Sequence, residues 1–239
     1  MGKGPGPIPK GGFIYQTNDL PSSNSDLPIV NEGNSFTRLD YEIRGNTVYV
    51  DWEYLDKGTN DGFTAKNHPY IDIIQFDDIP LQRKGGSGLQ MKNYKGNIIA
   101  DDTPFIQNDT DLSYAFSGST ATDFGNIAGW DVSGVKNMQG MFNDAINFDE
   151  NIGVWNTSSV QNMSEMFGGA TDFNQNIGSW NTSSVTDMRL MFFDADAFNQ
   201  NIGSWDTSLV TDMINMFRGA NDFNQNILNW TVNSGLTPG

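Results

Sequence analysis

Apolar residues in the second half of the chain recur every 25 residues. Tryptophan marks this period most clearly, and isoleucine, methionine and phenylalanine keep the same spacing, so each residue type forms a column through successive repeats. A fixed period of about 20 to 50 residues is typical of a solenoid, in which each repeat is one coil stacked on the next. The pattern therefore predicts a solenoid of about four to five coils over residues 101–239. Its core columns are Trp130, Trp155, Trp180, Trp205 and Trp230; Ile127, Ile152, Ile177, Ile202 and Ile227; Met138, Met163, Met188 and Met213; and Phe142, Phe167, Phe192 and Phe217.

Within one repeat, the spacing of apolar residues predicts one helical segment and one short strand. The helical segment follows Ser183 and Ser184, which stand where an N-cap belongs. Its apolar residues are spaced i, i+3, i+6, i+7 and i+10, as on one face of a helix or of successive 3₁₀ turns: Val185, Met188, Met191, Phe192 and Ala195. Residues 173–180 are too short and too interrupted by glycine for a second helix, so they are expected to form a strand.

Two of the columns could have either a structural role or a role in recognition. The tryptophans are interpreted as stacked core aromatics rather than an exposed strip for sugar stacking. An asparagine column precedes the isoleucine column, and we expect inward amides that bond the backbone of adjacent coils rather than a recognition surface. Its members are Asn126, Asn151, Asn176, Asn201 and Asn226.

The first 100 residues have a different organisation. Residues 1–35 are rich in Gly, Pro, Ser and Asn and cannot bury enough apolar surface by themselves, so we expect an extended docking arm that a partner holds in place. Residues 36–100 predict a small antiparallel β-domain that caps the first coil. Its expected strands are 36–43, 47–54, 70–76 and 89–94, and the first two are joined by a tight hairpin at Gly45-Asn46.

Charge and composition exclude several classes of partner. Residues 1–100 carry 10 basic and 12 acidic residues, and residues 101–239 carry 3 basic and 17 acidic residues, a net charge of −14 for the repeats. Such a surface repels phosphate backbones, so nucleic acid is not an expected partner. There is no run of about 18 apolar residues for membrane insertion and no apolar segment near Met1 typical of a signal peptide. Cysteine is absent, which removes disulfides and thiolate metal sites.

The repeat resembles a known family. The string Phe173-Asn-Gln-Asn-Ile-Gly-Ser-Trp-Asn-Thr-Ser-Ser-Val-Thr-Asp-Met-Arg-Leu-Met-Phe192, with its counterparts over residues 107–230, is similar to the BspA-like leucine-rich-repeat surface proteins. The resemblance implies a right-handed leucine-rich-repeat-type solenoid, a surface location and a role in adhesion or host contact. It implies no catalytic residue. The chain differs from the bacterial pattern because it lacks a lipid-anchor cysteine and a cell-wall sorting tail.

Outside the core columns, the residues that could act in catalysis or bind a metal form no recognised catalytic or cofactor site. His68 is the sole histidine and stands in a polar segment without a nucleophile arrangement. Residues 56–62 and the pair Asp194 and Asp196 are the candidates for Ca²⁺, but neither has the register of an EF-hand or nonapeptide loop. The short column Thr157, Thr182 and Thr207 is attributed to helix capping rather than ice binding. We therefore expect no enzyme activity and no cofactor.

The C-terminal coil shows what kind of protein to expect. Ile227, Leu228 and Trp230 lie in a coil with no polar capping helix after it, so we expect them to contact an assembly partner. With the docking arm, this favours a non-enzymatic structural protein on a virion or extracellular surface: a virion decoration, fibre or tail-associated component. It would form a homo-oligomer or dock onto a larger particle, with a host receptor or glycan as its target. The alternatives are a bacterial cell-surface adhesin and a glycan- or ice-binding module.

Overall fold

The computed structural model describes residues 13–16, 36–44, 47–54, 72–75, 80–81, 97–100, 103–106 and 110–231. The expected strand at 89–94, His68 and the acidic segment 56–62 lie outside these residues. So does the segment 232–239 after the last coil.

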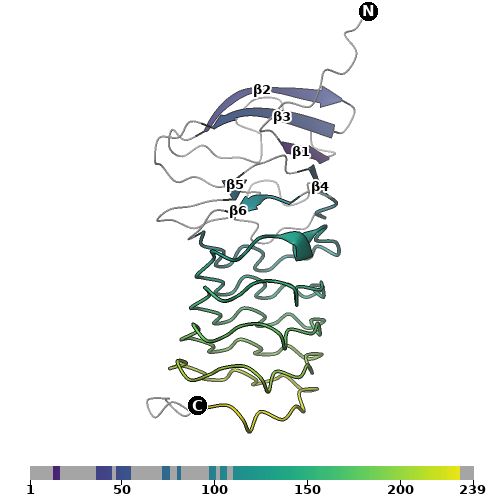
Figure 1. The fold of residues 1–239 in the computed structure, drawn as a ribbon. Helices are drawn as coiled ribbons and strands as arrows, with labels where there is room; N and C mark the ends of the chain where they lie inside the picture. Colours follow the sequence, from purple (N-terminus) through teal and green to yellow (C-terminus); the bar gives the residue numbers. More distant parts are fainter. Residues whose placement is uncertain are drawn as a thin grey trace, which may run out of the picture.

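A four-stranded antiparallel sheet precedes the repeats (Figure 1). Strands β2 (Phe36–Arg44) and β3 (Thr47–Tyr54) occupy the residues where the sequence indicates a hairpin, with Arg44 opposite Thr47. A bulge between Arg38 and Asp40 adjusts their register. Strand β4 (Asp72–Gln75) falls within the third expected strand.

The sheet also contains a strand from the segment expected to be a docking arm. Strand β1 (Phe13–Gln16) lies between β3 and β4 and pairs antiparallel with both, giving the order β2-β3-β1-β4. Part of residues 1–35 therefore completes a sheet of its own chain. A second, parallel pair joins β5 (Pro80–Leu81) to β6 (Phe105–Ile106), which the sequence does not signal because each strand has two residues.

Residues 110–231 form five stacked coils, seen as successive turns of chain below the strands in Figure 1. We number them as coil 1 (110–134), coil 2 (135–159), coil 3 (160–184), coil 4 (185–209) and coil 5 (210–231). One parallel bridge per coil keeps them in register, through Asp111, Asn137, Asn162, Asp187 and Asp212. The stack continues upward to residues 97–100, where Ile98 pairs with Phe124.

The coils contain turns where the sequence predicts a helix and a strand. In coil 4 no helix occupies residues 185–195, and in coil 3 no strand occupies residues 173–180. Apart from the bridge at Asp187, these residues form turns and irregular segments. The 3₁₀ turn η2 (Ile127–Gly129) is the one helical segment among residues 110–231.

Backbone hydrogen bonds explain why the helix does not form. The N–H groups of Met188, Leu190 and Phe192 donate to carbonyls of coil 5 at 2.9 Å, whereas the intervening N–H groups close turns within coil 4. Leu190 and Asp194 also have positive φ angles of 54° and 51°, which an α-helix excludes. The expected apolar face is nevertheless correct, because all five residues named for it are fully buried. The 25-residue period identifies which residues face inward but not the conformation of the backbone at those residues.

Candidate functional site

The tryptophan column lies in the core of the stack. Trp130, Trp155, Trp180 and Trp205 are 3–4% exposed, and Trp230 at the open end is half-buried. Rings in successive coils lie parallel with centroids 6.3–6.4 Å apart from Trp155 to Trp230. Each indole from Trp155 onward also donates its Nε1–H to an isoleucine carbonyl of the preceding coil, as Trp180 does to Ile152 at 3.0 Å. The column therefore joins coils through both its faces and its polar atom.

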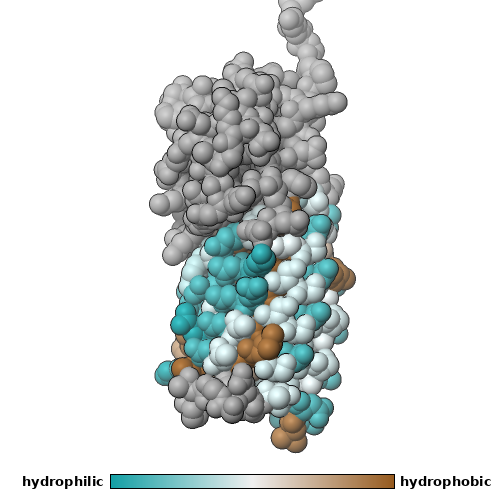
Figure 2. Space-filling view, turned by 60° about the vertical axis from the view of Figure 1, so that its left-hand side comes forward, coloured by the Kyte–Doolittle hydropathy of each residue, from teal (hydrophilic) through white to brown (hydrophobic). Residues whose placement is uncertain are grey.

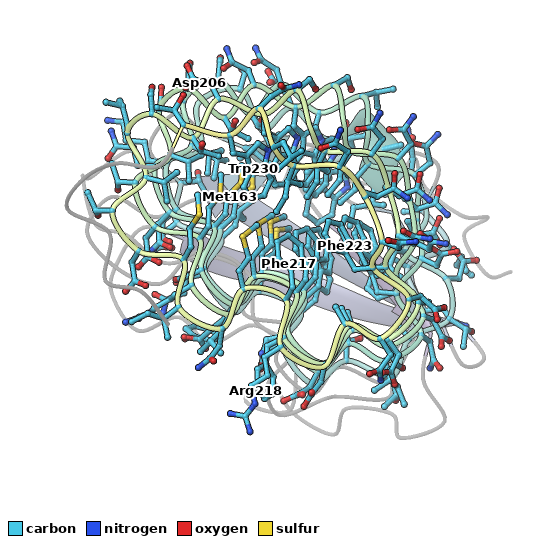
Figure 3. All side chains as sticks on the ribbon, turned by 90° about the horizontal axis from the view of Figure 1, so that it is seen from below. Met163, Asp206, Phe217, Arg218, Phe223 and Trp230 are labelled. Carbon is cyan, nitrogen blue, oxygen red and sulfur yellow. The ribbon has the colours of Figure 1, made fainter. Side chains whose placement is uncertain are left out.

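The other core columns surround the tryptophans. In coil 5, Met213 and Phe217 are half-buried. In coils 2 to 4 the expected members are fully buried, namely Ile152, Ile177, Ile202, Met163, Met188, Phe167 and Phe192. A second phenylalanine column stacks against the first, with the rings of Phe167 and Phe173 3.9 Å apart and nearly parallel. Figure 3 looks along the stack and shows Phe217, Phe223, Trp230 and Met163 inside the ring of backbone, with Asp206 and Arg218 at its outer edge.

The asparagine column does not form the expected inward ladder. All five of its side chains are exposed: Asn126, Asn151, Asn176, Asn201 and Asn226. From Asn151 onward, each Oδ1 accepts the backbone N–H two residues later in its own coil, as Asn176 does from Gly178 at 3.1 Å. This local turn satisfies the amide oxygen more readily than a bond to another coil, which is why the expectation was wrong.

The amide ladder between coils lies two positions earlier. Asp149 accepts the backbone N–H of Asn174, and Asn174 and Asn199 accept from Asn199 and Asn224 in turn, at 2.8–3.0 Å. Gln200 and Gln225 add side-chain bonds along the same line. This column repeats with the same period as the one we singled out, so periodicity alone could not separate them.

The threonine column also joins coils and caps no helix. Thr157, Thr182 and Thr207 are 1% exposed, and each hydroxyl donates to a backbone carbonyl of the following coil at 2.9–3.0 Å. Ser183, expected as an N-cap, donates instead to Asn181 within a local turn. The hydroxyls of this column are therefore directed into the stack and away from solvent.

A polar cluster crosses four coils on one side of the stack. Tyr114 lies over Gly140, where a Cβ atom would overlap its ring, and donates its hydroxyl to Glu165 at 3.1 Å, two coils away. Burial raises the pKa of the Tyr114 hydroxyl, and the nearby Glu165 carboxylate raises it further. Burial likewise raises the pKa of Asp187, although Arg189 opposes this shift. Gln139 donates to the Tyr114 hydroxyl and Arg189 pairs with Glu165, so the cluster links coils 1 to 4.

Of the two Ca²⁺ candidates, only the pair Asp194 and Asp196 lies among the described residues. No group of three or more His, Cys, Asp or Glu side chains there is placed to hold a metal ion. In the expected Ca²⁺ pair, Asp196 accepts a hydrogen bond from Asn221 at 2.6 Å. None of the described helical segments has the length and apolar character needed to cross a bilayer.

The open end at coil 5 is the remaining candidate surface. Of the three residues expected there, Leu228 is 90% exposed, while Ile227 and Trp230 are half-buried. Leu228 occupies the column of Gly153, Gly178 and Gly203, where a Cβ would overlap a backbone carbonyl of the following coil. A side chain fits at position 228 because no described coil follows. The sequence already shows this change, because leucine replaces glycine in the column at position 228.

These observations define a protein built from stacked 25-residue repeats with a continuous aromatic core. A family model covers this region: residues 110–230 match the family described as Mycoplasma protein of unknown function, DUF285. The chain belongs to this family, and the match begins and ends with the coils. No curated protein and no solved structure was found to match the chain. The family match does not extend to the sheet β1–β4.

Proposed function

We propose that the protein is a non-enzymatic structural protein displayed on a surface, where its stack of coils mediates adhesion or host contact. The observation that carries this proposal is the direction of its reactive and aromatic side chains. The tryptophan indoles and threonine hydroxyls form hydrogen bonds between coils, and the face of the coils seen in Figure 2 carries mostly hydrophilic and neutral side chains with a few hydrophobic ones. Such a molecule offers a rigid display surface rather than a catalytic pocket.

The fold supports a finer classification within this proposal. We place the stack among right-handed leucine-rich-repeat-type solenoids related to the BspA-like surface proteins, with turns in place of the usual helix. The shared column order of Asn, Ile, Trp, Val, Met and Phe supports this placement. The parallel bridge in each coil is compatible with it, because parallel strands line one face of such repeats.

Two settings fit a displayed repeat protein. The family description refers to Mycoplasma, which favours a bacterial cell-surface adhesin. A virion decoration, fibre or tail-associated component is the other setting, and in both the chain would dock as part of a larger assembly. The acidic coils, with 14 acidic and 3 basic residues and so a net charge of −11 over residues 110–231, would face outward.

The glycan- and ice-binding alternatives lack an exposed array in the described coils. Sugar stacking needs exposed aromatic faces, whereas the tryptophan column is buried through coil 4. Ice binding through the threonine column would need free hydroxyls, and these donate to carbonyls of the next coil. Surface display is therefore the better-supported proposal.

Antibody labelling of intact material tests the proposal and separates its two settings. Antibodies raised against residues 110–231 should label intact particles or cells of the source organism before lysis. Labelling confined to purified virions supports the decoration role, and labelling of bacterial cells supports the adhesin role. Signal that emerges only after lysis would contradict surface display in either setting.

A further inference from the structure

Four columns of the repeat hold a different residue in each of coils 2 to 5. All four lie in the same short stretch of the coil, residues 139–146 in coil 2, whereas most other columns hold only one or two residue types. Residues that the stack requires recur in each coil, because each coil meets similar neighbours. We call these four columns the variable face: Gln139, Ser164, Arg189 and Ile214; Gly140, Glu165, Leu190 and Asn215; Asn143, Gly168, Phe193 and Arg218; and Ile146, Thr171, Asp196 and Asn221.

Contacts between coils join the variable face into one surface along the side of the stack. Arg189 pairs with Glu165 of the preceding coil at 3.9 Å. The guanidinium of Arg218 lies over the ring of Phe193, 5.5 Å from its centroid. Figure 3 shows Arg218 pointing outward from the ring of backbone. The face therefore follows the outer side of the coils and not the end of the stack.

One column of this face contains residues that are unfavourable for its backbone conformation. The φ angle in this column is 53–58° in coils 2 to 5, which glycine and asparagine adopt easily, as Gly140 and Asn215 do. Glu165 and Leu190 adopt it against the preference of their side chains. Glu165 accepts a hydrogen bond from Tyr114, whereas a leucine side chain can form none. Neutral exchange of surface residues would favour glycine or asparagine here, so the leucine indicates a role outside the stack.

The variable face also differs in charge from the rest of the stack. Its charged members are Glu165, Asp196, Arg189 and Arg218, so its net charge is zero. Residues 110–231 hold 14 acidic and 3 basic residues, which leaves 12 acidic residues and 1 basic residue outside the face. The surrounding charge repels polyanions, and an isolated carboxylate is the anionic group that the face suits best.

Arg218 is placed to receive such a carboxylate. The carboxylates of Glu165 and Asp187 lie 3.9 and 3.7 Å from Arg189, whereas no described carboxylate is within ion-pair distance of Arg218. Arg218 is exposed, and its contact with the Phe193 ring holds the guanidinium in place. A guanidinium held in this way can bind a carboxylate through two parallel hydrogen bonds.

Apolar side chains occupy the neighbouring positions of the variable face. The backbone N–H of Leu190 donates to Ile214 at 2.9 Å, and that of Phe193 donates to Leu190 at 3.1 Å. All three side chains are half-buried. Arginine next to aromatic and aliphatic groups is typical of the residues that contribute most to binding between proteins. This composition suits a protein segment as the partner.

We infer that the variable face at coils 4 and 5 binds a peptide segment of a partner protein that presents one carboxylate beside an apolar side chain. Arg218 binds the carboxylate, and the apolar side chain packs on Leu190, Phe193 and Ile214. The inference rests on the proposed adhesion role and deepens it, because it names the face that makes the contact and the chemistry of the partner.

Peptide selection on the purified full chain tests the inference. The probe is a library of short random peptides displayed on phage, selected in parallel on the wild type and on a double variant, Arg218→Gln with Leu190→Asn. Peptides enriched only on the wild type should share an Asp or Glu beside Leu, Ile or Phe. As synthetic peptides, they should bind each single variant at least about tenfold more weakly than the wild type. Val154→Ser is the control, since Val154 is 72% exposed and serine occupies its column at Ser179 and Ser204; it should bind them as the wild type does.

Melting temperatures separate recognition from folding. Leu190→Asn should lower the melting temperature by less than about 4 °C, because asparagine suits this backbone, as at Asn215. A larger fall would show that Leu190 serves the stack and would overturn the inference. The same peptides from both selections, no enriched peptide, or wild-type-specific peptides without a carboxylate would also overturn it.

The selection uses the isolated chain, whereas the surface-labelling experiment uses intact cells or particles. Loss of labelling with peptide binding retained would remove the display role alone. Surface labelling without the expected peptide binding would remove this inference alone.

Discussion

Gly153, Gly178 and Gly203 are glycines because the next coil passes where a side chain would begin. A Cβ at Gly178 would overlap the backbone carbonyl oxygen of Asn201, and backbone cannot move aside as a flexible side chain can. This contact distance, more than any conformational freedom, fixes the residue type. The column ends at Leu228, where no described coil follows.

Substitution in this column should therefore depend on the coil in which it is made. Gly178→Ala should lower the free energy of unfolding by about 1–3 kcal/mol, because the coils must separate locally to admit the methyl group. Leu228→Ala is the matched control and should change it by less than about 0.5 kcal/mol. Urea denaturation of both variants measures the difference. Equal effects at the two positions would show that coil spacing does not select glycine.

Asp187 illustrates a residue whose charge opposes folding. It occupies the bridge column in which Asn137 and Asn162 stand in coils 2 and 3, and burial raises its pKa. Because the folded carboxyl holds its proton more tightly, the unfolded chain ionises first as pH rises, and stability is lost between the unfolded and folded pKa values. An amide would accept the same bond from the Arg189 N–H without that loss.

Asp187→Asn should therefore stabilise the protein at neutral pH. The gain should shrink as pH falls below the raised pKa of Asp187 and vanish below the ordinary carboxyl range, where the side chain is protonated in both states. Thermal unfolding of wild type and variant across a pH series measures this. A gain that persists unchanged at low pH would mean that charge is not the cause.

At the scale of the element, the tryptophan column acts as a connector between coils. Trp180 stacks on Trp155 and Trp205 and bonds to Ile152, so its loss removes contacts on both faces. Trp180→Ala should cost about 3–5 kcal/mol of unfolding free energy. Trp230→Ala should cost less, since Trp230 is half-buried and stacks on one described tryptophan, Trp205, rather than on two. Denaturant unfolding of both variants tests this order, and a larger cost at Trp230 would contradict it.

The 25-residue period identifies which residues face inward, because burial repeats with the coil. It cannot identify the helix-free backbone, since the bonds that replace helical ones reach carbonyls 24 residues away, as from Met188 to Asp212. The spacing of Val185, Met188, Met191 and Phe192 suits a helix and a series of turns equally well.

Competition between a local turn and a bond to the next coil explains why the ladder between coils was expected at the wrong asparagine column. In Asn176-Ile177-Gly178 the asparagine closes a turn with the glycine N–H, whereas Asn174 lies beside the next coil and bonds across to Asn199. Both columns repeat in sequence, so only their distance from the neighbouring coil distinguishes them. Strand β1 escaped prediction because four strand residues lie within a segment rich in Gly and Pro.

At the scale of the whole molecule, the net negative charge opposes folding. The chain carries 29 acidic and 13 basic residues, a net charge of −16. Self-repulsion of such a surface destabilises the compact state, and salt screens it. Raising NaCl from about 0.05 M to about 0.5 M should therefore raise the melting temperature in scanning calorimetry. A melting temperature that falls with NaCl would show that favourable ion pairs outweigh repulsion.

The tryptophan column is the spine of the stack, and we propose on this basis that recognition belongs to the outer surface and the coil 5 end. Hydrogen exchange of the indole Nε1–H groups, followed by NMR, tests this claim most directly. We expect slow exchange at Trp155, Trp180 and Trp205, whose indoles are buried and bonded to the preceding coil, and faster exchange at Trp230. Rapid exchange at Trp155, Trp180 and Trp205 would show that the column faces solvent, and would contradict the account.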